Sequence, residues 1–137
     1  KLANVLRECS RKMREQVAMA TPLVPLAIAA YQERLGAKLR EAVANLDEDR
    51  IRQEVGVFAA KVDVAEEIAR LEAHLDELER VIAKGGAVGK RLDFLMQELG
   101  REANTLASKS VSAEVTGIAL ELKLLIEQLR EQVQNLE

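Results

Sequence analysis

The segment VGKRLDFLMQELGREANTLASKS, residues 88–110, predicts one long amphipathic helix. At about 100° per residue its apolar side chains form a single stripe, which consists of Leu92, Leu95, Met96, Leu99, Ala103 and Leu106. The opposite face holds hydrogen-bonding residues of which only the arginine is charged: Gln97, Arg101, Asn104, Thr105 and Ser108. Asn, Thr and Ser are poor helix formers, whereas a face that only serves solubility is usually rich in Glu and Lys. We therefore expect this polar face to contact a ligand.

The segments on either side of this helix show the same helical periodicity. From residue 63 to residue 84 the apolar positions are Val64, Ile68, Leu71, Leu75, Leu78 and Ile82. From about residue 112 to residue 136 they are Val115, Ile118, Leu122, Leu125, Leu129, Val133 and Leu136, at alternating spacings of three and four. Gly85-Gly86 is expected to end the helix over residues 63–84, and the region from Ser108 to Ser112 to provide a break and a cap for the last helix. No segment shows the alternation of a strand, so the sequence predicts an all-α fold.

The first 50 residues predict a helical hairpin. Thr21-Pro22 and Pro25 interrupt the periodic pattern, because proline inside a helix removes a backbone hydrogen bond. We therefore expect one helix over residues 1–20 and an antiparallel second helix that ends near residue 44. A helix over about 47–62 follows. The predicted domains are this hairpin, residues 1–50, and a bundle of amphipathic helices, residues 51–137.

Composition excludes several classes of protein. Cys9 is the only cysteine and His74 the only histidine among 137 residues, so an internal disulfide and a Cys/His zinc site are both excluded. No apolar run approaches the ~20 residues of a membrane span, and no signal peptide is evident, so we expect a cytoplasmic protein. Because the sequence starts at Lys1, inside a helical pattern, we expect it to be a piece of a longer protein. The net charge is −3, but an acidic segment over residues 62–85 lies between two mildly basic ones.

A first group of candidate functional residues lies on the helix that starts near Asp63. Glu67, Arg70 and His74 fall within about 60° of one another, with Glu77 beside them. A carboxylate, a guanidinium and an imidazole together can hold a divalent ion, a phosphate and a transferable proton. The alternative is structural: Glu66 and Arg70 form an ordinary salt bridge, and Asp63 with Glu66 forms a capping box.

A second group accompanies the polar face. A row of charged side chains flanks that face, namely Arg91, Glu98, Glu102 and Lys109, and Asp93 is a further carboxylate that is either a metal ligand or a charge at the helix start. Arg, Gln and Asn match phosphates and base edges, and Thr and Ser match phosphate oxygens. The alternative is a structural network of ion pairs. We see no aromatic residue beside the polar face, so base stacking is not expected.

These residues carry a family resemblance. The run GKRLDFLMQELGREANTLASKS, its continuation AEVTGIALELKLLIEQLREQVQNLE and the upstream DVAEEIARLEAHL resemble the C-terminal end of the bacterial YicC/YloC family. The match is dense over residues 51–137, and residues 1–50 resemble the helical middle region of the family. The opening Gly89-Lys90-Arg91 departs from the family pattern, which has arginine where Lys90 stands. Lys90 keeps the charge but loses the bidentate grip that arginine gives on a phosphate.

The resemblance implies a function. Members of this family are endoribonucleases that depend on manganese or magnesium, are longer than this chain and carry a separate N-terminal domain. They form ring-like hexamers, take RNA into a central channel, and are linked to small-RNA turnover. We therefore expect part of an endoribonuclease that cleaves single-stranded or small regulatory RNA, with no DNA or membrane partner. The isolated chain is expected to be weak or inactive.

The resemblance implies an activity but transfers no catalytic residues, so the matching polar residues receive roles from their side-chain chemistry. We predict His74, Glu67 and Glu98 as catalytic, and Glu67, Asp93 and Glu98 as ligands of Mn²⁺ or Mg²⁺. The predicted RNA-binding residues are Arg70, Lys90, Arg91, Gln97, Arg101, Asn104, Thr105, Ser108 and Lys109. Whether water or the ribose 2′-OH attacks the phosphate stays open. The alternative function is a non-catalytic helical module for oligomerisation or RNA binding, with the chemistry in an N-terminal domain.

Overall fold

The computed structural model describes residues 2–86 and 89–135, and within them the chain forms five helices and no strand. They are α1 (Leu2–Ala42), α2 (Glu48–Val62), α3 (Ala65–Lys84), α4 (Gly89–Lys109) and α5 (Ala113–Gln134). The predicted all-α fold is confirmed. Val88 and Leu136, which the sequence analysis placed on helices, lie outside the described residues.

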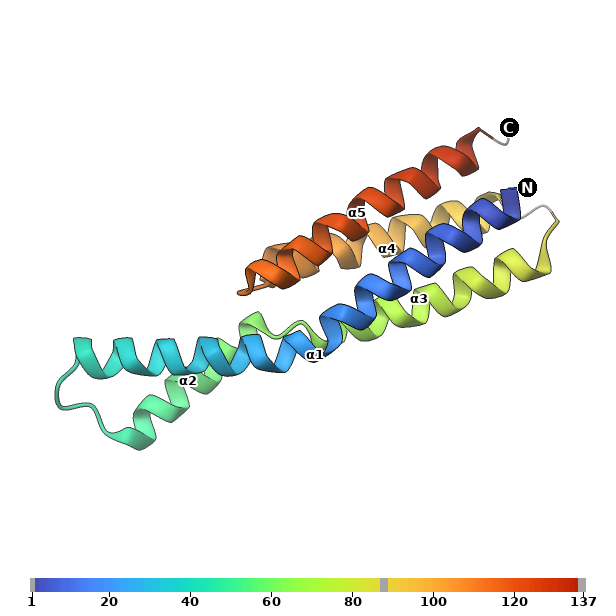
Figure 1. Ribbon diagram of the computed structural model, residues 1–137. Coiled ribbons are helices and arrows are strands. Elements are labelled where there is room, and N and C mark those ends of the chain that lie inside the picture. Colours follow the sequence, from blue (N-terminus) through green and yellow to red (C-terminus); the bar gives the residue numbers. More distant parts are fainter. Residues whose placement is uncertain (1, 87–88, 136–137) are drawn as a thin grey trace.

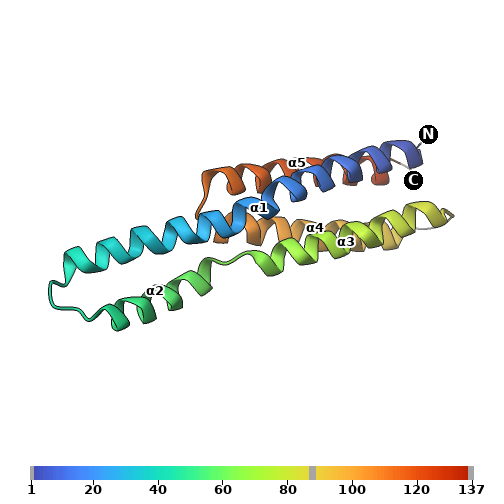
Figure 2. The same cartoon turned by 60° about the horizontal axis from the view of Figure 1, so that its bottom comes forward.

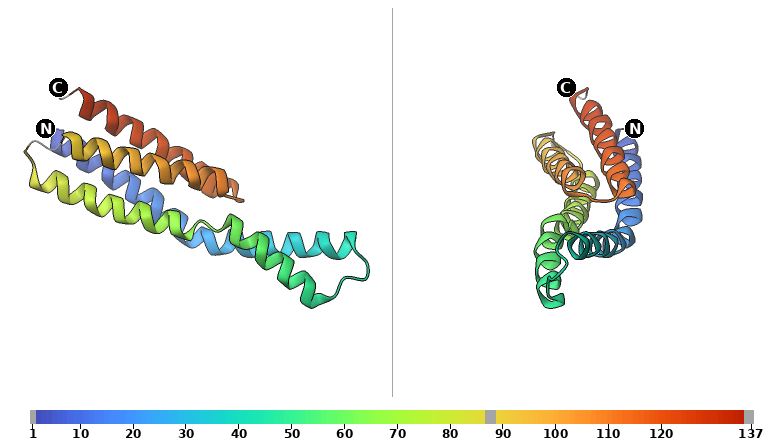
Figure 3. Two further views of the ribbon diagram at one scale, coloured as in Figure 1. Left: turned by 180° about the vertical axis from the view of Figure 1, so that it is seen from behind. Right: turned by 90° about the vertical axis from the view of Figure 1, so that its left-hand side faces the viewer.

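Four helices form an up-and-down bundle. The first half of α1 contacts α3 and α5, and α4 contacts the same two helices from the other side. The second half of α1 and all of α2 project beyond the bundle as a two-helix arm (Figures 1 and 2). The first residues of α1 and the last residues of α5 lie at the same end of the bundle, opposite the arm (Figure 3).

The prediction that residues 1–44 form two antiparallel helices is wrong. Helix α1 runs without interruption through Pro22 and Pro25, and it changes direction where it leaves the bundle (Figures 1 and 3). The helix persists because residues before and between the prolines are buried, with Val17 3% and Val24 7% exposed. The observed hairpin instead pairs the second half of α1 with α2. The division of the chain into domains after residue 50 stays a prediction.

Local signals set the other helix ends. The Asp47 carboxylate accepts a hydrogen bond from the Asp49 amide at the start of α2, and Ser112 Oγ accepts one from the Val115 amide at the start of α5. Gly85 ends α3 with a φ of 68°, a backbone conformation that favours glycine. The predicted capping box is wrong, because α3 begins one residue later than expected, with Val64 at the N-cap. Asp63 still accepts a hydrogen bond from the Ala65 amide.

The core consists of the predicted apolar stripes. All six predicted positions of α4 are buried, and so are those predicted from Val64 to Ile82 and from Val115 to Val133. These stripes join Leu6, Cys9, Met13 and Val17 of α1 in one cluster. Because each helix buries one stripe, its remaining faces are free to present polar groups between neighbouring helices. Two such polar strips lie along α4, one beside α5 and one beside α3.

Candidate functional site

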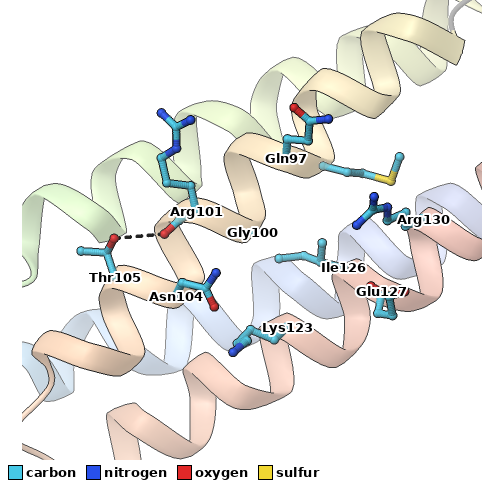
Figure 4. Close-up of a pocket in the computed structure, with 10 residues that line it drawn as sticks. Gln97, Gly100, Arg101, Asn104, Thr105, Lys123, Ile126, Glu127 and Arg130 are labelled. Carbon is cyan, nitrogen blue, oxygen red and sulfur yellow. Dashed lines mark hydrogen bonds between the residues drawn. The ribbon is translucent and has the colours of Figure 1, made fainter.

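The first strip is an open groove of about 540 Å³ between α4 and α5. Its lining residues, of which Figure 4 labels nine, are Met96, Gln97, Gly100, Arg101, Asn104, Thr105, Lys123, Ile126, Glu127 and Arg130. Asn104 of α4 and Lys123 of α5 extend toward each other across it, whereas Arg101 rises at its edge, away from α5 (Figure 4). We call these ten residues the α4–α5 groove.

The α4–α5 groove carries an excess of positive charge. Arg101, Lys123 and Arg130 line it against one carboxylate, Glu127. Within residues 2–86 and 89–135, no carboxylate forms an ion pair with Lys123 or Arg130, whereas Arg101 lies 3.7 Å from Glu98. The groove is therefore a cationic strip on a chain whose net charge is −3.

Helical spacing brings these groups together. Positions 123, 127 and 130 are separated by four and three residues, so they share one face of α5. That face lies beside the α5 core stripe and looks toward the polar face of α4. Gly100 lies in the groove wall, and a Cβ atom added there would meet no other atom within 4 Å.

The second strip is a line of opposite charges between α3 and α4. Lys109 Nζ lies 3.4 Å from Glu67, the Arg70 guanidinium 3.7 Å from Glu102, and Arg91 2.9 Å from Glu77. We call this line, with the residues between its pairs, the α3–α4 seam. The pairs show that the two helices are antiparallel and fix their register.

The seam is buried at Glu67 and Glu102, and ion pairs lower the pKa of Glu77 at its other end. Glu67 is 5% and Glu102 7% exposed, so both carboxylates lie inside the protein with a cationic partner nearby. The hydrogen bond from Arg80, and then the one from Arg91, hold the pKa of Glu77 below its ordinary value. The predicted alternative, a structural network of ion pairs, is therefore present at this interface.

His74 and Glu98 lie between the paired charges of the seam. His74 is half-buried on α3, one turn after Arg70 and one turn before Glu77, both of which contact α4. The antiparallel register places it level with the turn of α4 that carries Glu98, whose side chain is 21% exposed. Two of the three predicted catalytic residues thus occupy the same level of one helix pair.

The predicted site residues divide between the two strips. Gln97, Arg101, Asn104 and Thr105 line the α4–α5 groove, and Ser108 lies outside it, with its hydroxyl donating to the Thr105 carbonyl oxygen. The remaining predicted residues with a partner across the helix pair lie in the seam: Glu67, Arg70, Arg91 and Lys109. We predicted that the polar face of α4 and the group from Glu67 to His74 on α3 look toward one another, either within one chain or across a subunit boundary. Within one copy of the chain they do not, because the polar face borders the α4–α5 groove whereas Glu67 contacts α4 on its other side.

The predicted metal ligands do not converge. Glu67 is paired with Lys109, Asp93 accepts a hydrogen bond from Gln97 at 3.3 Å, and Glu98 lies near Arg101. In the part of the chain that the structure describes, no group of three or more His, Cys, Asp or Glu side chains is placed to hold a metal ion. Among the described residues of one copy, the three predicted ligands therefore do not form a common site.

Comparison with known proteins shows the family of the chain. Residues 20–137 match the family model described as endoribonuclease YicC-like, C-terminal. The chain belongs to this family. It is 47% identical over 136 residues to a protein of Haemophilus influenzae named probable endoribonuclease YicC, covering 96% of this chain and 47% of that protein. A Clostridioides difficile protein of the same name is 34% identical over the whole chain, which covers 52% of it.

The chain spans about half the length of these curated YicC relatives. The family match confirms the YicC/YloC family predicted from the sequence. No helix among the described residues is long and apolar enough to cross a membrane.

Sequence reasoning missed Lys123 and Arg130. They are the only basic residues after position 110, and their seven-residue spacing places both on one face of α5. The seven-residue spacing could have indicated a basic face on this helix, but the segment is acidic overall, so no basic face was expected. Glu102 was noted only as a flanking charge, whereas the structure buries it beside Arg70.

Proposed function

We propose that this chain is the RNA-binding and catalytic C-terminal part of an endoribonuclease. The single observation that carries the proposal is the α4–α5 groove, in which Lys123 and Arg130 of α5 join Arg101 of α4. The names of the two relatives and the matched family model support the reaction class. The proposed substrate is single-stranded or small regulatory RNA.

The groove suits an RNA backbone. Lysine and arginine provide the sequence-independent attraction to phosphates, and Asn, Gln and Thr side chains add hydrogen bonds to phosphate and sugar oxygens. No carboxylate in residues 2–86 and 89–135 forms an ion pair with Lys123 or Arg130, so their charge is available to a ligand. The groove follows about two turns of each helix and is open rather than enclosed, which fits an extended strand.

The α3–α4 seam supplies the proposed chemistry. Cleavage of a phosphodiester requires one group that takes a proton from the attacking hydroxyl and one that gives a proton to the leaving oxygen. An imidazole can serve in either role, which makes His74 the candidate, and Glu98 is the carboxylate on the facing turn of α4. The predicted dependence on Mn²⁺ or Mg²⁺ has no ligand set within the described residues of one chain, so it stays a prediction.

A second candidate function is an RNA-binding module without catalytic groups of its own. The ion pair between Glu67 and Lys109 favours it, because that pair occupies a carboxylate that catalysis was expected to use. In that case the chemistry lies in another part of a longer protein. A ring-like homo-oligomer, as the family resemblance implies, is compatible with both candidates.

The proposal is tested in the full-length protein with a short unpaired RNA. The variant Lys123→Gln/Arg130→Gln should weaken RNA binding and reduce the slope of log affinity against log salt by about 1.4, because each lost phosphate contact removes about 0.7. Arg52→Gln is the matched control, since Arg52 is an exposed arginine on the arm. Unchanged binding by the double variant would rule out the groove.

Catalysis is tested separately from binding. His74→Ala and Glu98→Gln should slow cleavage by 10²-fold or more while leaving RNA affinity within about twofold, since general acid–base groups typically contribute 10²–10⁴-fold. If both variants cleave at the normal rate and the groove variant still loses binding, the second candidate function is correct. Gel analysis of the cleaved ends measures the rate and shows whether a cyclic phosphate forms.

A further inference from the structure

Phe94 is a large aromatic side chain that the core does not use. It is 53% exposed, although its neighbours Leu92 and Leu95 on α4 are only 1% and 2% exposed. The chain contains two phenylalanines, one tyrosine and no tryptophan, so aromatic residues are scarce in it. We therefore ask what the exposed ring of Phe94 contacts outside the core.

Phe94 lies on the ridge of α4 between the two polar strips. Arg91 and Glu98, three residues before and four after it, belong to the α3–α4 seam. Gln97 and Arg101, three and seven residues after it, belong to the α4–α5 groove (Figure 4). Residues at these spacings are neighbours on a helix surface. A strand that passes from the groove to the seam over the first half of α4 crosses the turn that carries Phe94.

We propose that Phe94 stacks against one unpaired RNA base as the strand crosses α4. The inference rests on the proposed function, and it specifies the substrate as RNA whose bases are free to leave a helix. Aromatic side chains stack on the flat face of any base, whereas bases within a duplex are already stacked and out of reach. Lys90 and Arg91 lie one turn before Phe94 on α4 and Arg101 two turns after it, so cations for phosphates are present on both sides of the ring along the helix, although Arg91 is also 2.9 Å from Glu77.

The surroundings of Phe94 favour RNA over a protein partner. A protein interface centres on several apolar side chains with few charges between them. The helical neighbours of Phe94 on the outer surface of α4 are instead Lys90, Arg91, Gln97, Glu98 and Arg101. A lone aromatic ring among cations and amides is the pattern of a base-stacking platform. Our expectation that no aromatic residue accompanies the polar face is therefore wrong, because Phe94 lies at its edge.

The variant Phe94→Leu tests the stacking contact in the full-length protein, because leucine keeps an apolar side chain but has no flat ring. Its affinity for a short unpaired RNA should fall by about 5- to 150-fold, the effect of losing one stacked base. Its affinity for a duplex RNA of the same length should not change. Phe58→Leu is the matched control, since Phe58 is a 39% exposed phenylalanine on α2 whose ring already lies 5.2 Å from Lys61 Nζ.

An RNA series that lacks one base at each position in turn identifies the stacked base. The natural protein should lose affinity when one particular base is removed, and Phe94→Leu should be insensitive to that same removal. This coupling between side chain and base is not expected from a residue with a purely structural role.

The outcomes separate the two proposals. If Phe94→Leu binds unpaired RNA normally while Lys123→Gln/Arg130→Gln does not, the stacking role is overturned and the proposed function stands. If Phe94→Leu loses duplex and unpaired RNA equally and changes mass in light scattering, Phe94 is a protein contact and the stacking role is overturned. If the natural protein binds neither RNA, the proposed function fails and the stacking role fails with it.

Discussion

The ammonium group of Lys109, at the end of α4, lies 3.4 Å from both carboxylate oxygens of Glu67, in the first turn of α3. The Glu67 side chain is 7% exposed and that of Lys109 33%. The pair therefore ties the last turn of α4 to the start of α3 and keeps a buried carboxylate compensated. Two residues that we predicted for metal and RNA contacts hold each other in this arrangement.

Lys109→Met should destabilise the fold more than removal of the whole pair. The single variant leaves the Glu67 carboxylate buried without its cation, so the free energy of unfolding should fall by about 2 kcal/mol. Glu67→Gln/Lys109→Met should recover part of that loss, because no uncompensated charge remains. Urea unfolding measures both. Lys123→Met is the control and should change stability by less than about 0.5 kcal/mol, since Lys123 is exposed. Equal losses in the single and double variants would contradict this account.

Pro22→Ala and Pro25→Ala should each stabilise the helix that contains them. Proline cannot donate a backbone hydrogen bond, so the carbonyl oxygens of Ala18 and Thr21 lack their helical donors. Alanine restores the donor and favours the helix, with an expected gain of about 1–3 kcal/mol. Thermal unfolding measures the shift in Tm. A lower Tm would show instead that the change in direction of α1 is needed for the packing of Val24 and α2.

The sequence predicted the core well because burial leaves a periodic trace. Each helix of the bundle repeats an apolar residue every three or four positions, and those positions are buried. The prolines misled the prediction of α1, because local preference ends a helix at proline, whereas the burial of Val17 before Pro22 and of Val24 between the prolines favours a continuous helix. Packing partners far apart in the sequence leave no such local signal.

The sequence predicted the α4 side of the α4–α5 groove but not its α5 side. The polar face of α4 was visible because Asn, Thr and Ser are unusual on a helix surface. Lys123 and Arg130 carry charges that look like ordinary solubilising residues, and their role depends on α5 lying beside α4. The partners of Glu67 and Glu102 depend in the same way on the antiparallel register of α3 and α4. Neither relationship can be derived from one helix alone.

Acid should weaken the fold through carboxylates that are paired in the native state. Hydrogen bonds from Arg80 and Arg91 hold the pKa of Glu77 below its ordinary value of 4.5, and the hydrogen bond from Arg40 does the same for Glu48. A carboxyl whose folded pKa is lowered stabilises the protein above its ordinary pKa and loses that contribution as the pH falls through the folded pKa. Urea unfolding should therefore show stability falling below about pH 4.5. Glu77→Gln should show a smaller decline, and an identical decline would exclude Glu77 as a contributor.

Cys9 should react slowly with thiol reagents while the protein is folded. Its side chain is part of the core, at 8% exposure, and burial raises the pKa of its thiol. Thiolate is the reactive form, so both access and reactivity are reduced. The difference in labelling rate between the natural protein and Cys9→Ser isolates this residue, and that difference should become large only in denaturant. Rapid labelling without denaturant would show that the start of α1 opens from the bundle.

Gly100→Leu should block the α4–α5 groove without changing any charge. Gly100 lies in the groove wall, where an added Cβ meets no atom within 4 Å, so leucine can enter without displacing the core. Replacing a glycine inside a helix should also raise the free energy of unfolding by about 0.5–1 kcal/mol. If the variant is more stable but binds RNA less well, the weaker binding results from the blocked groove and not from unfolding.

Gly56→Leu is the matched control for Gly100→Leu. Gly56 lies inside α2, on the arm, and an added Cβ there also meets nothing within 4 Å. Both variants should gain similar stability in urea unfolding, because the helix preference of the new residue is the same. Only Gly100→Leu should weaken binding of a short unpaired RNA, measured by fluorescence anisotropy. Normal RNA binding by a folded Gly100→Leu variant would mean that the strand does not lie in the groove, because leucine would occupy part of its path.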